Sequence, residues 1–195
     1  MFPAFLKLQG RRVVLVGGGP VAAGKLQSLM AAGADVTVVA PDVRPEIEGR
    51  GVTIVRRAFE PGDLDEAWWV VAAAPPEVNR QVLAAAEARR IFVNAVDDPR
   101  HATAYAGGVV RRDGVTIAIS TGGRAPAMAG LLREALEAWL PADLDRWMAA
   151  ADEARRSWKQ EQVPMERRRP LLLETLLKLY DESRMPNPES QLPKG

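Results

Sequence analysis

The sequence predicts an α/β fold: a Rossmann-type doubly wound parallel sheet, followed by a dimerisation region of hairpin and helix and a small C-terminal helical domain. Three observations predict it. Residues 13–16 form a short, mostly β-branched apolar run that leads into a glycine-rich turn and then a helical pattern. Further apolar runs follow, separated by polar or helical segments as in βαβ units, at residues 36–40, 52–55, 68–73 and 91–96. After residue 102 this alternation stops.

Composition limits the classes of function. The chain has 195 residues, of which 47% are hydrophobic, and its net charge of +1 gives no overall attraction to nucleic acid or to a membrane surface. The absence of cysteine excludes disulfides and thiolate metal sites. No apolar run reaches membrane-spanning length, and the first ten residues do not resemble a signal peptide. We therefore expect a cytoplasmic protein with no metal site and with neither nucleic acid nor a membrane as its partner.

The glycine-rich turn is the strongest functional signal in the chain. Gly17-x-Gly19-x-x-Ala22 matches the dinucleotide-binding fingerprint. The first glycine permits a tight turn, the second lets the backbone approach a pyrophosphate, and the alanine lets helix and strand pack closely. The phosphates would lie against the free amides at the start of the helix, where Pro20 fits the first turn.

Two other interpretations of this turn stay open. Gly19-x-x-x-x-Gly24-Lys25 satisfies most of a P-loop pattern, but Leu26 stands where that pattern requires a Mg²⁺-binding Ser or Thr. Alternatively, the glycines serve only tight packing between strand and helix. The second strand at 36–40 completes a strand, helix, strand unit with a right-handed crossover, and this context favours dinucleotide binding.

The end of the second strand is where an acidic residue usually binds the cofactor ribose. Pro41 and Asp42 follow the strand here. Asp42 either reaches the adenosine ribose or caps a short helix at 45–48. Arg44 is close enough to leave a 2′-phosphate open, although no arginine directly follows the strand. We expect NAD rather than NADP.

The fourth and fifth strands end in further candidates. Ala74 lies in a run of small residues after the fourth strand. Such a run either lets the backbone lie close to a cofactor or forms a plain turn. Asn94, Asp97 and Asp98 stand at the end of the fifth strand. A carboxylate there either acts as a general acid or base beside a nicotinamide or opens a turn. We expect cofactor contacts from Ala74 and Asn94 and catalysis from Asp97, and we interpret His101 as a loop residue.

The patterns divide the chain into four parts. An NAD-binding Rossmann domain is predicted at residues 1–102. The dimerisation region at 103–142 contains an Asp113-Gly114 hairpin turn, whose antiparallel strands suit pairing with another subunit. A C-terminal helical domain follows at 143–184. The tail at 185–195 is rich in Pro, Asn and Ser, and we expect it to be disordered.

Candidate substrate contacts lie in this second half. The glycine turn containing Thr121, Gly122 and Arg124 opens a helix, and it either holds an anion or is an ordinary turn. Arg167 and Arg168 belong to a basic run between the last two predicted helices. That run is either a solvated face or a clamp for a carboxylate-rich ligand, because arginine pairs with carboxylates through two hydrogen bonds.

Several motifs together carry a resemblance that covers nearly the whole chain. They are Phe2-Pro3, Leu8, residues 16–19 with Val21-Ala22 and Lys25, residues 33–34 with 36–38, Asn79, residues 90–94 with Val96-Asp97, residues 120–123 with Pro126, and residues 131–134 and 166–169. With these motifs the chain resembles the precorrin-2 dehydrogenase/sirohydrochlorin ferrochelatase family, which includes stand-alone enzymes and the N-terminal part of bifunctional sirohaem synthases.

The resemblance implies NAD⁺-dependent oxidation of the tetrapyrrole precorrin-2 to sirohydrochlorin on a homodimer. It aligns Asp97 with the family's essential aspartate, which would take the departing proton. In relatives that also insert Fe²⁺, the same aspartate is thought to assist insertion, and no residue here separates the two kinds of relative. The cofactor contacts that the resemblance transfers are Gly17, Gly18, Gly19, Pro20 and Val21 beside the pyrophosphate and Pro41 and Asp42 beside the ribose.

The sequence departs from the family at Thr121 and Ala125, which replace serines of the glycine turn. Ala125 lacks a side-chain oxygen with which to cap the helix. We also find no methyltransferase region and expect another protein to methylate uroporphyrinogen. A different class of function is an NAD-sensing dimeric regulatory protein without catalysis. Loss of turnover with retained NAD⁺ binding on replacing Asp97 separates the enzyme from the sensor.

Overall fold

A computed structural model describes residues 1–96, 98 and 102–184 of the chain. The described residues fall into two compact units. The first comprises residues 1–107 and 120–129, and the second comprises residues 108–119 and the chain from 130 onward. Asp97 and His101, and the tail expected to be disordered, lie outside the described residues. The four-part division of the chain stays a prediction.

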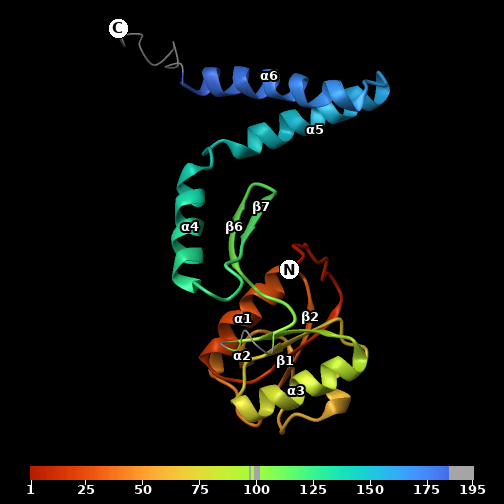
Figure 1. Cartoon of the computed structure of the whole chain (residues 1–195), viewed down its shortest axis with the longest axis vertical. Helices are drawn as coiled ribbons and strands as arrows, with labels where there is room; N and C mark the ends of the chain where they lie inside the picture. Colours follow the sequence, from red (N-terminus) through yellow and green to blue (C-terminus); the bar gives the residue numbers. More distant parts are fainter. Residues whose placement is uncertain (97, 99–101, 185–195) are drawn as a thin grey trace. The chain divides into compact units, whose positions relative to one another are not determined.

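The first unit is built on a five-stranded parallel sheet (Figure 1). Its spatial order is β3-β2-β1-β4-β5, so the chain runs outward from β1 on one side and then returns to β1 to build the other. This reversal beside β1 is where open α/β sheets bind ligands. The strands are β1 (Arg12–Val16), β2 (Asp35–Val39), β3 (Thr53–Val55), β4 (Trp69–Ala72) and β5 (Phe92–Ala95).

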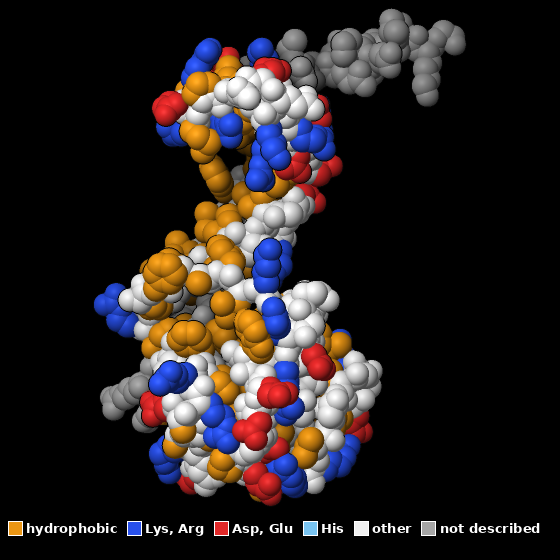
Figure 2. Space-filling view, turned by 90° about the vertical axis from the view of Figure 1, so that its right-hand side faces the viewer, with side chains coloured by type: hydrophobic (Ala, Val, Ile, Leu, Met, Phe, Trp, Pro, Cys, Tyr) orange, Lys and Arg blue, Asp and Glu red, His pale blue; other side chains and the backbone are white. Residues whose placement is uncertain are grey.

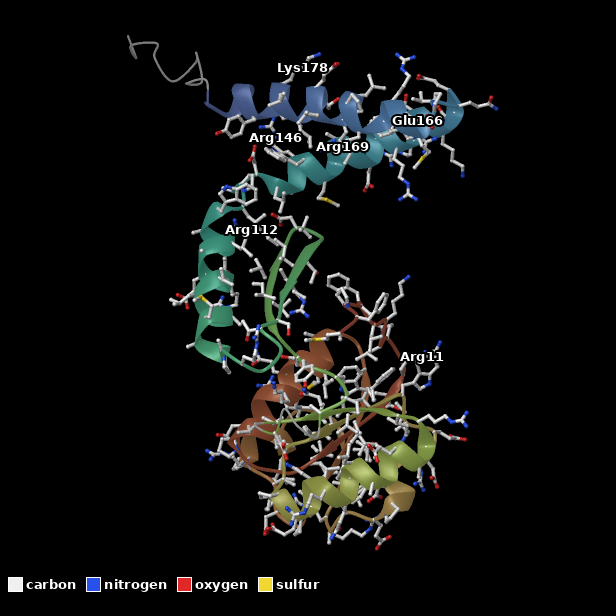
Figure 3. All side chains as sticks on the ribbon, viewed as in Figure 1. Arg11, Arg112, Arg146, Glu166, Arg169 and Lys178 are labelled. Carbon is white, nitrogen blue, oxygen red and sulfur yellow. The ribbon has the colours of Figure 1, made fainter. Side chains whose placement is uncertain are left out.

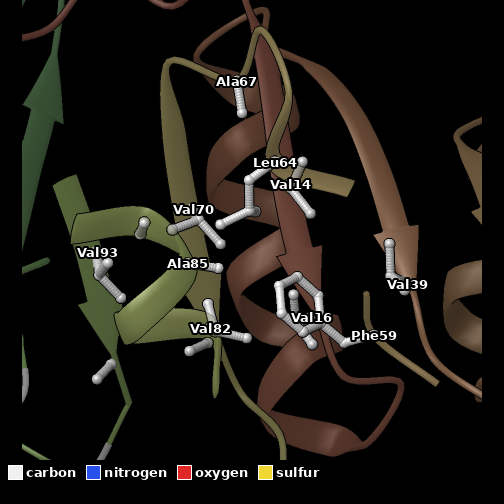
Figure 4. Packing of buried hydrophobic residues seen from close by; sticks show 13 residues of the cluster. Val14, Val16, Val39, Phe59, Leu64, Ala67, Val70, Val82, Ala85 and Val93 are labelled. Carbon is white, nitrogen blue, oxygen red and sulfur yellow. The ribbon is translucent and has the colours of Figure 1, made fainter. Parts of the chain in front are cut away.

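Helices cover both faces of this sheet. The helical segments are α1 (Pro20–Ala31), α2 (Pro45–Glu48), the 3₁₀ helix η1 (Pro61–Leu64) and α3 (Pro76–Arg89). Val14 and Val16 of β1 pack with residues of α3 and η1 on one face (Figure 4). Val13 and Leu15 pack with residues of α1 and α2 on the other. Because successive strand side chains alternate between faces, a strand buried on both sides is apolar throughout, and the predicted doubly wound sheet is confirmed.

The N-terminal segment leaves most of its apolar side chains in solvent. Phe2 is 89% exposed and Phe5 is 71% exposed. Leu8 is the member that packs against the core on the α1 face. The first residues therefore leave aromatic side chains at the surface of the described chain.

A buried carboxylate ties β3 to η1. Asp63 is 9% exposed and accepts two hydrogen bonds from the Arg57 guanidinium, at 2.6 and 2.9 Å, and one from the Glu60 backbone N–H at 2.8 Å. Burial raises the pKa of Asp63, but the hydrogen bonds from Arg57 and Glu60 outweigh it, so the pKa lies below its ordinary value. The ionised carboxylate therefore stabilises the fold.

We expect Asp63→Asn to lower the free energy of unfolding by about 1–3 kcal/mol at pH 7, because a charge-assisted hydrogen-bond network is lost. A lowered folded pKa contributes stability above the unfolded pKa of about 4, and this contribution disappears as the pH falls through the folded value. Urea unfolding at pH 7 and near pH 3 should show the difference from wild type shrinking in acid. Asp65→Asn, which alters an exposed carboxylate paired with Arg89, is the matched control. An equal decrease in the free energy of unfolding in both variants would contradict the stabilising role assigned to the buried Asp63 carboxylate.

The second unit begins with the predicted hairpin. Strands β6 (Gly108–Arg112) and β7 (Val115–Ile119) pair antiparallel. Asp113 and Gly114 join them with φ values of 47° and 83°, as a type I′ turn requires. Val110 packs with Leu140 and Leu144, and Arg112 donates a hydrogen bond of 2.8 Å to the Leu140 carbonyl (Figure 3).

Three helices complete the described chain: α4 (Pro126–Trp139), α5 (Leu144–Gln160) and α6 (Met165–Arg184). Helices α5 and α6 lie side by side (Figure 1), with Trp147 edge-on to Tyr180 at 6.4 Å between ring centroids. The expected position of the basic run, between two helices, is wrong. It forms the first turns of α6, which continues through Pro170, whose missing N–H leaves one helical hydrogen bond unmade. No helix in the described ranges is long and apolar enough to cross a membrane.

Candidate cofactor site

A cavity of about 490 Å³ opens at the carboxyl ends of β1, β2 and β4. Its size suits part of a small-molecule ligand, and its place at the reversal of strand order is where such sheets bind nucleotides. The lining is largely apolar and backbone. It consists of Val16, Gly17, Gly18, Gly19, Val39, Ala40, Pro41, Asp42, Ala58, Phe59, Ala73, Ala74, Pro75, Val78 and Gln81.

The first two glycines of the turn are packed against neighbouring backbone. Gly17 has φ +122°, and a Cβ there would overlap the carbonyl oxygen of Ala73 and lie 2.7 Å from its carbonyl carbon. A Cβ at Gly18 would overlap the carbonyl oxygen of Asp42. The turn is held by hydrogen bonds from Gly17 N–H to the Val39 carbonyl and from Arg44 N–H to the Gly18 carbonyl, at 2.9 and 3.0 Å. These positions therefore exclude side chains for structural reasons.

Gly19 differs from both. A Cβ built there meets no protein atom within 4 Å, although the residue lines the cavity. Gly19 is the N-cap of α1 and offers no side chain to the helix, and Pro20 occupies the first position. The following amides, beginning at Val21, are therefore open to an anion, and the helix dipole favours negative charge there. This cradle, free of side chains, fits a dinucleotide pyrophosphate.

Pro41 and Asp42 form the wall of the cavity beside β2. The alternative role of Asp42 as a helix cap is wrong, because the N-cap of α2 is Arg44 and no side chain caps that helix. Asp42 instead lies at the surface of the cavity, where its carboxylate can accept hydrogen bonds from ribose hydroxyls. The Arg44 guanidinium is paired with Glu46 through hydrogen bonds of 3.0 and 3.2 Å.

Ala74 lines the cavity beyond β4, where its backbone is held by a residue that the sequence pattern did not single out as a contact. Asn79, buried in α3, accepts a hydrogen bond of 3.1 Å from the Ala74 N–H through Oδ1. The signal in the sequence is an asparagine one turn after a double proline. Sequence reasoning also missed the lining residues Ala58, Phe59, Val78 and Gln81.

Three of the predicted cofactor contacts do not line the cavity: Pro20, Val21 and Asn94. Asn94 is 6% exposed. Its Nδ2 donates a hydrogen bond of 3.1 Å to the Ala104 carbonyl, while Oδ1 is buried and has no hydrogen-bond partner among the described residues. Thr103 reinforces the same junction, because its Oγ1 accepts a hydrogen bond of 2.8 Å from the Val93 N–H. These contacts hold β5 against residues 103 and 104.

The predicted substrate contacts belong to different units, and none lines the cavity. Thr121, Gly122 and Arg124 lie in the first unit, in the turn before α4. Thr121 Oγ1 accepts a hydrogen bond of 3.2 Å from the Ala125 N–H, so the threonine supplies the oxygen that Ala125 lacks. In the second unit, Arg168 donates to the Val163 carbonyl at 2.9 Å, and Arg167 lies beside it in α6.

Comparisons with known proteins match the chain in two adjacent regions. Residues 4–108 match a family described as putative NAD(P)-binding, and residues 112–138 match one described as sirohaem biosynthesis protein central. Siroheme synthase 2 of Klebsiella pneumoniae subsp. pneumoniae is 42% identical over 172 residues, which are 86% of this chain and 38% of that protein. Siroheme synthase of Methylobacillus flagellatus is 42% identical over 164 residues, or 81% and 35%. The chain thus spans less than two fifths of these relatives.

A solved structure matches over a greater share of its own length. The structure of SirC, a precorrin-2 dehydrogenase, aligns with a TM-score of 0.67 and 26% sequence identity. The match covers 89% of this chain and 88% of that one. The parallel sheet and the helical region that follows it are therefore found together in a chain of similar extent.

Proposed function

This chain belongs to the putative NAD(P)-binding family, and on that premise we propose that it is an NAD-dependent oxidoreductase that converts precorrin-2 to sirohydrochlorin in sirohaem biosynthesis. The observation that carries the proposal is the cavity whose cradle at Gly19 is free of side chains, at the start of α1. The similarity to SirC over nearly its whole length supports the choice of substrate.

The reaction removes two hydrogens from the tetrapyrrole, one as a hydride and one as a proton. The bound dinucleotide supplies the hydride acceptor. The amides after Gly19 would hold the pyrophosphate, and the Asp42 carboxylate would accept hydrogen bonds from the ribose hydroxyls. Asn79 fixes the backbone of Ala74 in the cavity wall. The carboxylate of Asp97 takes the proton that leaves the substrate carbon.

A second copy of the chain completes the proposed assembly. Helix α4 leaves Met128, Leu131, Leu132 and Trp139 exposed, with Trp139 at 76%. Figure 2 shows one face of the molecule, on which hydrophobic side chains gather at the surface in addition to charged ones. A contiguous apolar helix face in water is typical of a surface that another subunit covers. The same applies to the antiparallel strands β6 and β7, which pair with no other strand of the described chain and so leave backbone groups at their outer edges. Sedimentation equilibrium should give the mass of a homodimer, and the mass of one chain would contradict it.

The turnover experiment uses the purified protein and enzymatically made precorrin-2 without oxygen, with NAD⁺, with NADP⁺ or with neither. We expect sirohydrochlorin absorbance and NADH to appear together in the NAD⁺ reaction. NAD⁺ binding without turnover would reject the enzyme and favour an NAD-sensing regulatory protein.

Adding Fe²⁺ to the same reaction tests whether the protein also uses this metal as a substrate. Insertion into sirohydrochlorin faster than in a protein-free control would assign a chelatase activity to the chain. Insertion at the control rate would limit the chain to oxidation. In the described part of the chain, no group of three His, Asp or Glu side chains is arranged to hold a metal ion.

A further inference from the structure

The charges beside the ribose wall of the cavity are arranged in pairs. Arg44 forms a bidentate ion pair with Glu46, which lies two residues later in α2. Arg56, just after β3, pairs with Glu48 of the same short helix. Only the first of these pairs is joined to the glycine turn, because the Arg44 backbone N–H donates to the Gly18 carbonyl at 3.0 Å. Asp42, two residues before Arg44, lines the cavity.

These pairs matter because the two nicotinamide dinucleotides differ at this end of the site. A 2′-phosphate on the adenosine ribose is accommodated in such folds by an arginine near the end of the second strand, whereas a free 2′-hydroxyl is bound by a carboxylate. The chain carries both kinds of residue there, Asp42 and Arg44. The planar guanidinium fork of Arg44 is already satisfied by the two oxygens of a carboxylate, which is the geometry that a phosphate would need.

We propose that Glu46 determines the preference of this site for a dinucleotide with a free 2′-hydroxyl, because its carboxylate occupies the Arg44 guanidinium that a 2′-phosphate would need. The inference rests on the proposed cofactor function and adds a specificity-determining residue to it. The hydrogen bond from Arg44 lowers the pKa of Glu46, so the carboxylate is ionised at neutral pH. Asp42 supplies a second carboxylate at this end of the cavity, and Arg50 donates a hydrogen bond of 3.3 Å to the Glu46 carbonyl.

The test measures binding of NAD⁺ and NADP⁺ by isothermal titration calorimetry with the whole chain. In Glu46→Gln the competing charge is removed and Arg44 is free for a phosphate, so we expect the Kd for NADP⁺ to fall about tenfold. The Kd for NAD⁺ should stay within about twofold of the wild-type value, because Glu46 does not line the cavity. The double variant Glu46→Gln/Arg44→Ala should lose the gain.

Glu48→Gln is the matched control, because it removes the same charge from the same short helix but releases Arg56 instead of Arg44. It should leave the ratio of the two Kd values unchanged. An unchanged ratio in Glu46→Gln, or an equal shift in Glu48→Gln, would overturn the inference while NAD⁺ binding still supported the proposed cofactor site. If the wild-type protein bound neither dinucleotide, the cofactor site and this inference would both be rejected.

Discussion

Gly19→Ala should weaken NAD⁺ binding about 10- to 100-fold and leave the free energy of unfolding within about 0.5 kcal/mol of wild type. The reason is that the added methyl group meets no protein atom within 4 Å but enters the open space at the start of α1. A phosphate held there would lose its close approach to the backbone amides. Calorimetric titration with NAD⁺ and urea unfolding of the same preparation separate the two effects.

Gly17→Ala should differ from Gly19→Ala by lowering the stability of the fold. Its Cβ would overlap the Ala73 carbonyl oxygen, and its φ of +122° is a backbone conformation that alanine rarely adopts, so we expect unfolding to become easier by roughly 2–4 kcal/mol. Gly24→Ala is the matched control, because this glycine lies inside α1, outside the cavity lining, with room for a Cβ. It should bind NAD⁺ normally and gain about 0.5–1 kcal/mol of stability. Normal NAD⁺ binding by Gly19→Ala would contradict the prediction and would mean that the pyrophosphate does not bind at Gly19.

The fold was predictable because its central strands are buried on both faces. Such strands appear in the sequence as unbroken apolar runs. The observed ends of β1 and β2 differ from the predicted ends by at most one residue. The 3₁₀ helix η1 was not predicted, because it depends on Asp63 and its partner Arg57 rather than on apolar spacing. The start of α6 was misplaced because Pro170, a helix-breaking residue by its local chemistry, lies inside the helix.

The sequence predicted those parts of the candidate site that are formed by residues adjacent in the chain. The glycine turn is such a part, and Gly17, Gly18 and Gly19 all line the cavity. Asn79 could not be assigned a role in this way, since its effect depends on a hydrogen bond to Ala74 that forms only when α3 packs on the sheet. Phe59 lines the cavity from the segment after β3, which has no motif of its own.

Asp97→Asn should reduce turnover of precorrin-2 with NAD⁺ about 10²- to 10⁴-fold, the range typical of a lost general base. The amide has nearly the shape of the carboxylate but cannot accept the proton that leaves the substrate. Asp97 follows β5, whose exit is held by the hydrogen bonds of Asn94 and Thr103. The Kd for NAD⁺ should therefore change less than about twofold, because the pyrophosphate cradle and the ribose wall are untouched.

The neighbouring acid provides the control for this prediction. Asp98→Asn removes the same charge one residue later, and a reaction that depends on one placed carboxylate should retain most of its turnover. Equal losses in both variants would indicate that the charge of the segment matters and not a proton acceptor at Asp97. Full turnover by Asp97→Asn would show that Asp97 is not the base. Lost turnover with normal NAD⁺ binding would identify an enzyme, because a sensor needs no carboxylate beside the nicotinamide. If the Fe²⁺ reaction is also accelerated by the wild-type protein, its loss in Asp97→Asn would place both reactions at one site.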